Sequence, residues 1–292
     1  MPSGKTLNKV MKRPKTLYVS DLDGTLLGAA SELSDASAQM LNQAISLGAD
    51  FTIATARTPA TVSRLLKKVD MKLPAIAMTG AVRWDFNTHD YSKPKFIDPA
   101  QAEELLAIYR RHNLPVFHYS LGENAVEVRH CGDLSDLERK FADDRSGSAF
   151  KRFMLSDDIS SASLERTLLF YSMQPTAQVE RLYREISEIE GINPVFYHDI
   201  FGPDVALLEV FSEAASKASA VQSIADEVGA ERVVVFGDNV NDIPMMQTAT
   251  HAVAVENAID RVREMADEVI GCNTSDCVAR WILNDIADTI NH

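Results

Sequence analysis

Two short acidic motifs lie far apart in the 292-residue chain, and each directly follows an apolar run that favours a β-strand. The first motif, DLDGT, contains Asp21 and Asp23, and the second, GDNVND, contains Asp238 and Asp242. Side chains two positions apart on an extended segment point the same way, so both aspartates of the first motif can face one pocket. Carboxylates this close repel each other unless a cation joins them or one keeps its proton. The two motifs therefore indicate a site for a hard divalent cation, Mg²⁺ above all.

Two further residues could bind an anion next to these acids. Thr55 ends the apolar run FTIAT and offers a hydroxyl beside backbone N–H groups. Lys217 begins an amphipathic stretch and offers a cation to a phosphate or to the acids. Each feature alone has an ordinary structural explanation, such as a turn, a helix cap or a solvated lysine. Four such features at the ends of strands or helices in one consistent fold are harder to explain in that way.

Apolar runs alternate with amphipathic helical patterns in the first and last thirds of the chain. Strand-helix-strand order implies parallel strands joined by right-handed crossovers. In such a sheet, ligands bind at the carboxyl ends of the strands, which is where the two acidic motifs and Thr55 fall. The predicted strands are 16–20, 51–55, 75–78, 232–236 and 251–255, and helices are predicted to begin after Ser34, at Thr58 and at Lys217.

The middle of the chain has a different pattern, in which polar and apolar residues alternate as they do in a half-exposed antiparallel sheet. An α+β unit is therefore expected to be inserted into an α/β unit. The expected division is a flexible leader at 1–14, a core formed by 15–84 and 211–292, and an inserted domain at 85–210. The predicted strands of the insert lie near 115–119, 125–130, 167–173, 194–198 and 205–211, with helices over 101–111 and 178–189.

The composition argues against several classes of function. The chain has 29 Lys+Arg against 42 Asp+Glu, a net charge of −13, which disfavours binding to nucleic acid or to anionic membranes. Its 3 cysteines are too few and too scattered for a disulfide framework or a zinc site. No apolar run approaches the roughly 20 residues that span a bilayer. We expect a cytoplasmic protein that acts on a small molecule as a monomer or a weak homodimer.

The ordered motifs DLDGT, IATAR, Lys217 and GDNVNDIPMM resemble those of the haloacid dehalogenase (HAD) superfamily. An insert between the second and third motifs is similar to the large cap of the Cof-type sugar-phosphate phosphatases, subclass IIB. The resemblance extends from about residue 15 to the tail AVAVENAIDRVREMADEVI. It implies a doubly wound, Rossmann-like parallel-sheet core with an inserted α+β cap domain.

The resemblance also implies roles for individual residues. Asp21 corresponds to the nucleophile that forms an aspartyl-phosphate, and Asp23 to the acid that protonates the leaving alkoxide and later activates water. Thr55 and Lys217 correspond to residues that hold and neutralise the phosphoryl group. The implied ligands of Mg²⁺ are Asp21, Asp23 through its backbone carbonyl, Asp238 and Asp242. The expected substrate contacts are Thr55, Arg57, Thr79, Gly80, Lys217 and Asn241.

The expected activity is Mg²⁺-dependent hydrolysis of small phosphorylated metabolites, sugar phosphates above all. The chain departs from the family pattern at Ala56 and Ala218, where glycine is usual, and at Thr79, where asparagine is usual. None of these departures removes a charged catalytic group. Retention of both Asp21 and Asp23 favours hydrolysis or phosphoryl transfer to an alcohol. The alternatives are a sugar phosphomutase or phosphotransferase, which would use the same residues, and a non-catalytic metabolite binder on the same fold.

The insert is expected to close over the core and to exclude water from the reaction. Its polar residues are candidates for contact with the leaving group, although each is more often an ordinary surface residue. The candidates are His118, Tyr119, Arg129, His130, Lys151 and Arg152.

Overall fold

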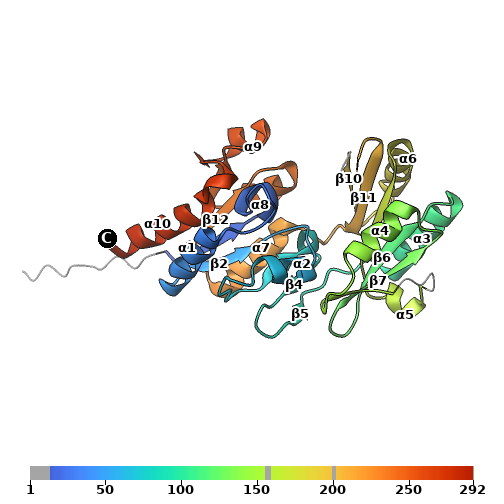
Figure 1. The fold of residues 1–292 in the computed structure, drawn as a ribbon, viewed down its shortest axis with the longest axis horizontal. Coiled ribbons are helices and arrows are strands. Elements are labelled where there is room, and N and C mark those ends of the chain that lie inside the picture. The colour runs from blue at the N-terminus through green and yellow to red at the C-terminus, as the bar shows by residue number, and fades with distance from the viewer. Residues whose placement is uncertain (1–13, 155–158, 199–201, 292) are drawn as a thin grey trace, which may run out of the picture.

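The computed structural model describes residues 14–154, 159–198 and 202–291, which form two bodies joined by two chain segments (Figure 1). The larger body, which we call the core, contains the beginning and the end of the described chain. The smaller body, which we call the cap, is formed by its middle part. The predicted leader, 1–14, lies outside the described residues apart from its last residue.

The core is built on a five-stranded sheet in which every pair of neighbouring strands is parallel. β1 lies between β12 and β2, and its Leu17, Tyr18 and Val19 are buried. Such strands are apolar on both faces because helices cover the sheet on either side. The predicted α/β fold class is confirmed. In spatial order the strands are β14 (Glu268–Ile270), β13 (His251–Val255), β12 (Arg232–Gly237), β1 (Thr16–Ser20) and β2 (Asp50–Ile53).

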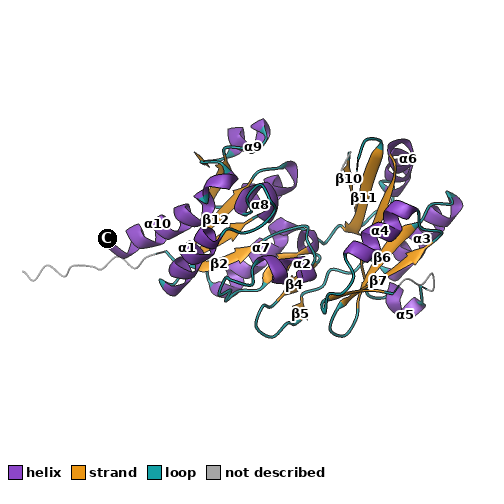
Figure 2. Ribbon diagram, viewed as in Figure 1, coloured by secondary structure: helices purple, strands orange, loops and turns teal. Residues whose placement is uncertain are grey.

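Helices pack around this sheet (Figure 2), and α7 (Lys217–Val228) is the one that matters most for the site. The hydroxyl of Ser216 accepts a hydrogen bond from the N–H of Ser219, and Gly229 ends the helix in the left-handed region at φ +67°. These two caps place Lys217 in the first turn of α7. None of the helices in the described residues is both long and apolar enough to cross a membrane. The other core helices are α1 (Asp35–Ser46), α2 (Pro59–Leu65), α8 (Ile243–Gln247), α9 (Asp260–Met265) and α10 (Cys277–Asn291).

The cap contains a six-stranded sheet in which all neighbouring strands are antiparallel except β7 and β8. In spatial order the strands are β10 (Ile192–Tyr197), β11 (Val205–Ser212), β9 (Thr167–Pro175), β6 (Val116–Leu121), β7 (Val126–Cys131) and β8 (Lys151–Phe153). Its helices are α3 (Pro99–Arg111), α4 (Asp136–Asp144), α5 (Ser161–Leu164) and α6 (Thr176–Ile186).

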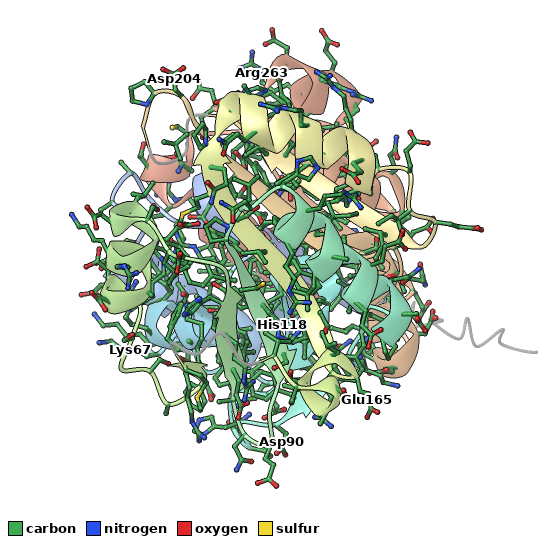
Figure 3. The ribbon with its side chains drawn as sticks, turned by 90° about the vertical axis from the view of Figure 1, so that its right-hand side faces the viewer. Lys67, Asp90, His118, Glu165, Asp204 and Arg263 are labelled. Atoms are coloured by element: carbon green, nitrogen blue, oxygen red, sulfur yellow. The ribbon has the colours of Figure 1, made fainter. Side chains whose placement is uncertain are left out.

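The two faces of the cap sheet have different surroundings. α3 and α6 cover the outer face, as Figure 3 shows from the cap end, and pack there with Ala206, Leu208 and Val210 of β11. The alternate residues Leu207 and Phe211 lie on the inner face, in a second apolar cluster that also includes residues of the core loop 77–82. The inner face is therefore directed toward the core.

A small side sheet marks where the core ends and the cap begins. Its strands pair antiparallel, and a single parallel bridge between Ala54 and Ile76 continues the order of the core sheet. Beyond it, the N–H of Ile97 already bonds to the carbonyl of Thr167 in the cap. We therefore propose that the cap spans about 93–213, so that it begins about eight and ends about three residues later than the expected 85–210. The side-sheet strands are β3 (Ala75–Ala77), β4 (Val82–Trp84) and β5 (Tyr91–Ser92).

His118 on β6 is fully buried beneath the outer face of the cap (Figure 3). Its Nε2 lies 2.8 Å from Thr167 Oγ1, and its Nδ1 has no hydrogen-bond partner among the residues described. Burial, aided by the positive charge of Arg129, lowers the pKa of His118 to about 3. The unfolded chain therefore binds more protons than the native state between about pH 6.5 and pH 3, and stability falls as the pH drops through this range.

We expect the variant His118→Gln to lose less stability on acidification than the wild type, because glutamine does not titrate. The difference between the two proteins in the free energy of unfolding should change by about 2 kcal/mol between pH 7 and pH 5. Urea titrations at the two pH values measure it. The control is His130→Gln, which removes a partly exposed histidine from β7 of the same sheet. Parallel pH dependences of wild type and His118→Gln would contradict the prediction.

Candidate active site

The first acidic motif lies at the carboxyl end of β1, in the middle of the core sheet. Asp21 is buried there, with its N–H bonded to the carbonyl of Phe236 on β12 at 3.0 Å. The chain then turns at Gly24, which has φ +79°. A Cβ at this position would overlap the carboxylate of Asp238. Glycine is therefore required both for the turn and for the close approach of the two motifs.

The structure brings three of the predicted acids together. Asp21, Asp238 and Asp242 each place a carboxylate oxygen within 4.8 Å of the others. Asp242 is fully buried, and its Oδ2 accepts hydrogen bonds from the N–H groups of Asp238 and Asn239 at 3.1 and 3.2 Å. Asp238 Oδ1 accepts a hydrogen bond from the hydroxyl of Thr25 at 2.8 Å. Asp242 thus fixes the loop that carries Asp238.

Lys217 joins the two motifs from the start of α7. Its ammonium group is buried and donates to Asp21 Oδ1 at 2.6 Å and to Asp242 Oδ1 at 2.8 Å. Burial lowers the pKa of Lys217, but the two adjacent carboxylates outweigh burial and raise that pKa above its usual value. Lys217 is therefore a permanent cation that holds Asp21 in one orientation.

The cluster carries more negative charge than Lys217 neutralises. Burial, with a contribution from the charge of Asp242, raises the pKa of Asp21 to about 7 and that of Asp238 to about 6. The Oδ2 atoms of Asp21 and Asp238 accept no hydrogen bond from any residue in the described part of the chain. Free carboxylate oxygens beside uncompensated charge fit a hard divalent cation, so the residues present suit Mg²⁺.

Asp23 lies at the same sheet edge but has different partners. Its side chain is 48% exposed and forms a bidentate ion pair with the guanidinium of Arg57, whose Nε lies 2.6 Å from Asp23 Oδ2. Arg57, expected as a substrate contact, is thus brought to the site as the partner of Asp23. Asp23 can donate a proton to a substrate only after this ion pair opens.

The remaining expected substrate contacts divide into two pairs, Thr55 with Asn241 and Thr79 with Gly80. Thr55 is buried at the floor of a cavity that Asn241 also lines. Thr79 and Gly80 are not among the cavity-lining residues. The N–H of Thr79 donates to the carbonyl of Thr55 at 3.0 Å, and Gly80 packs so tightly on the backbone of Ser216 that no Cβ would fit. In the structure the second pair therefore lies beside the backbone of Thr55 and Ser216, outside the lining of the cavity.

The cavity has a volume of about 540 Å³ and lies between the acidic motifs and the inner face of the cap sheet. The sequence singled out Tyr119 and Lys151 from its cap side but missed the others. The sequence did contain an indication that Glu209 has a special role, because it is the single charged residue in the apolar run VALLEVFS. The cap residues that line the cavity are Tyr119, Phe141, Arg145, Lys151, Leu169, Tyr171, Tyr197, Leu207 and Glu209.

This arrangement, in which two acidic motifs and a lysine meet at the edge of a parallel sheet beneath a cap, defines a class of hydrolase. Residues 18–282 match the haloacid dehalogenase-like hydrolase family, and the chain belongs to that family. The predicted membership, with its Cof-type cap, is confirmed, and so is the predicted enzyme class, a HAD-type phosphatase.

Individual relatives resemble the chain over nearly its whole length. It is 26% identical to a 5-amino-6-(5-phospho-D-ribitylamino)uracil phosphatase of Bacillus subtilis, over 91% of this chain and 96% of that protein. It is 24% identical to a pyridoxal phosphate phosphatase of Escherichia coli, over 91% of this chain and 97% of that protein. A solved sugar phosphatase of HAD subclass IIB has the same fold, with a TM-score of 0.66 at 18% identity over 93% of this chain and 98% of that one.

Proposed function

We propose that this protein is a Mg²⁺-dependent phosphatase of small phosphorylated metabolites that works through an aspartyl-phosphate on Asp21. The observation that carries the proposal is the position of Lys217 Nζ, 2.6 Å from one oxygen of a buried aspartate. The other oxygen of this aspartate accepts no hydrogen bond from the residues that the structure describes. A carboxylate attacks a phosphate ester only if nearby positive charge offsets their repulsion. Lys217 supplies part of that charge, and the acids around it suit a cation that supplies the rest.

In the first step, Asp21 attacks phosphorus while Lys217 holds its other oxygen in place. A P–O bond forms to Asp21, the P–O bond to the leaving alcohol breaks, and Asp23 gives its proton to the departing oxygen. The ion pair between Asp23 and Arg57 opens before this step, and Asp23 then takes up from solvent the proton that it transfers. The hydroxyl of Thr55 and the side chain of Asn241, which both line the cavity, hold the phosphoryl oxygens.

In the second step, Asp23 takes a proton from a water molecule, which attacks phosphorus. The bond between phosphorus and Asp21 breaks, and inorganic phosphate leaves. When bound, a divalent cation offsets charge between the phosphoryl group and the acids. It would be held by the side chains of Asp21 and Asp238 and the backbone carbonyl of Asp23, with Asp242 fixing the loop behind them.

The substrate class is proposed from the family and from the cavity. Relatives are named for phosphate esters of small metabolites, and a cavity of about 540 Å³ has the size of a typical small-molecule site. Sugar phosphates, which the resemblance implied, belong to this class. We also propose a cytoplasmic location and action as a monomer or weak homodimer, in keeping with 3 cysteines of which none is paired.

The test of the proposed function is the release of inorganic phosphate from 4-nitrophenyl phosphate and from a panel of metabolite phosphates, with Mg²⁺ or with EDTA. We expect turnover that depends on Mg²⁺. An isomerised sugar phosphate without free phosphate would instead indicate a mutase. Binding of a metabolite phosphate without any turnover would indicate a non-catalytic binder.

Asp238→Asn is expected to lose the response to Mg²⁺, because the variant lacks the charge of one proposed ligand. Its phosphatase activity should fall by about 100-fold or more. Thermal unfolding with and without Mg²⁺ should show a smaller stabilisation by the cation than in the wild type. The exposed Asp260 on α9 provides the control, since Asp260→Asn should respond to Mg²⁺ as the wild type does. An unchanged stabilisation of Asp238→Asn would remove Asp238 from the metal site.

A further inference from the structure

The cap side of the cavity contains two buried charged side chains that lack a full set of protein partners. Glu209 is 8% exposed, and its Oε2 has no hydrogen-bond partner among the residues described. Lys151 is 5% exposed and forms no ion pair with any carboxylate in the described part of the chain. Buried charges are costly unless something neutralises or hydrogen-bonds them. Since both side chains line the cavity, a ligand is the natural source of the missing partners.

Glu209 occupies a position where the strand pattern calls for an apolar residue. Along β11, Leu207 and Phe211 lie in the inner apolar cluster of the cap, and Glu209 lies between them on the same face. Its partner across the sheet is Tyr171 of β9. The carboxylate is therefore displayed on the face that is directed toward the core, among side chains that offer it almost no polar contact.

Aromatic rings form much of the wall around this carboxylate. The rings of Phe141 and Tyr171 are stacked, with centroids 5.1 Å apart and an interplanar angle of 21°. Tyr119 lies beside Tyr171 at 6.0 Å, and Leu169 completes this side. Flat apolar walls of this kind bind flat apolar rings well, because aromatic stacking adds to the burial of surface.

We propose that the cap side of the cavity is a subsite for a flat nitrogen heterocycle carried by the alcohol part of the phosphate ester. A ring N–H would donate to Glu209 Oε2. Lys151 lies on β8, four strands from β11 in the cap sheet, so it would face a more distant part of the bound ester. The ring itself would lie against Tyr119 and Tyr171. This inference rests on the proposed phosphatase function, which places the phosphate at Asp21.

A sugar ring fits these walls less well. Its hydroxyls point in all directions around the ring, and each needs a partner when it leaves water. The side chains of Phe141, Leu169 and Leu207 offer none. A heterocycle concentrates its polar atoms at its edge, where Glu209 can accept a ring N–H, and leaves its faces apolar.

The pKa values of Glu209 and Lys151 agree with the view that each side chain lacks a partner that a ligand could supply. Burial raises the pKa of Glu209 to about 7, although a hydrogen bond with Tyr197 opposes the change. Burial also lowers the pKa of Lys151 to about 8, aided by the charge of Arg145. A donor at Glu209 and an acceptor at Lys151 would each favour the ionised form of the side chain.

The experiment compares kcat/KM for pyridoxine 5′-phosphate, glucose 6-phosphate and glycerol 3-phosphate in the wild type and in Glu209→Leu and Glu209→Gln. The ring ester should be preferred over glucose 6-phosphate by about 10-fold or more. Both variants should lose about 10-fold or more on the ring ester and stay within about 3-fold on glycerol 3-phosphate, as expected for a hydrogen bond to a charged group. Glu209→Leu restores the apolar alternation of β11, so it should melt at a higher temperature while it loses this preference.

The matched control is Glu138→Gln. Glu138 is a buried glutamate of the same cap, but Ser135 and Gln174 donate hydrogen bonds to it and it does not line the cavity. Its variant should keep the wild-type preference between the esters. Equal losses of Glu209→Leu on all three esters, or equal use of glucose 6-phosphate by the wild type, would overturn the inference.

If no ester is hydrolysed, the proposed function fails, and calorimetric binding of pyridoxine 5′-phosphate decides the inference by itself. Binding to the wild type that weakens about 10-fold or more in Glu209→Leu would support the subsite. Equal binding to both proteins, or none to either, would overturn it.

Discussion

Asp21→Asn is expected to abolish phosphate release, with a fall in kcat on the order of 10⁴-fold or more, as for other enzymes that lose their nucleophile. The amide cannot form the acyl-phosphate bond through which both proposed steps pass. Its oxygen still accepts a hydrogen bond from Lys217, so binding of the phosphate ester should remain. The measurement is single-turnover hydrolysis of 4-nitrophenyl phosphate with enzyme in excess.

Asp285→Asn is the matched control for this result. Asp285 is a half-buried aspartate of the core that accepts hydrogen bonds from Tyr18 and Arg232, and it does not line the cavity. Its variant should keep wild-type turnover even if it melts earlier. Residual activity of Asp21→Asn within about 10-fold of the wild type would show that water attacks the ester directly, which would end the covalent mechanism proposed here.

The core could be predicted from the sequence because its strands are short, continuous and apolar. β1 and β13 begin and end at the predicted residues, and α7 begins at Lys217 as expected. Clear chemical signals fix such boundaries, for example Ser34, whose hydroxyl accepts a hydrogen bond from the N–H of Ser37 at the start of α1. The acidic motifs follow these strands directly, so their convergence also followed from the sequence.

The cap was predicted less completely because the elements that were missed are short or bury few side chains. α4 was missed, since the buried apolar side chains of this nine-residue helix are Phe141 and Ala142. Its start nevertheless carries a capping box, formed by Ser135 and Glu138, which is a sequence signal for the beginning of a helix. β8 of the cap, like β14 of the core, has three residues and is too short for a pattern to show.

The polar contacts of the site were likewise predicted only in part. The convergence of Asp21, Lys217 and Asp238 was predicted because the proposed chemistry requires those residue types in that order along the chain. The ion pair of Asp23 with Arg57 was not foreseen, because it depends on where two separate loops point their side chains. The aromatic wall of the cap was missed because tyrosines such as Tyr171, in an apolar strand, have the pattern of ordinary core residues.

Lys217→Met is expected to be the most destabilising of the substitutions considered, at about 3–5 kcal/mol near pH 8 without added cation. Methionine fills a similar volume but leaves the carboxylates of Asp21 and Asp242 buried without their cation. The penalty should shrink at pH 5. The pKa of Asp21 is already raised to about 7 by burial, and loss of the ammonium raises it further. A carboxyl whose pKa is higher in the native state than in the unfolded chain lowers stability as the pH rises. The loss grows from the pH of the unfolded-state pKa to that of the native-state pKa.

Urea unfolding of Lys217→Met at pH 5 and pH 8 in EDTA measures this dependence. The double variant Lys217→Met with Asp242→Asn is the decisive control, since it removes one of the two stranded charges. It should recover part of the lost stability at pH 8 and little at pH 5, where protonation of the cluster already relieves the repulsion. A loss that is equal at both pH values, and unaffected by Asp242→Asn, would mean that Lys217 stabilises the core by packing alone. In that case charge neutralisation at Asp21, on which the proposed catalysis depends, would lose its physical basis.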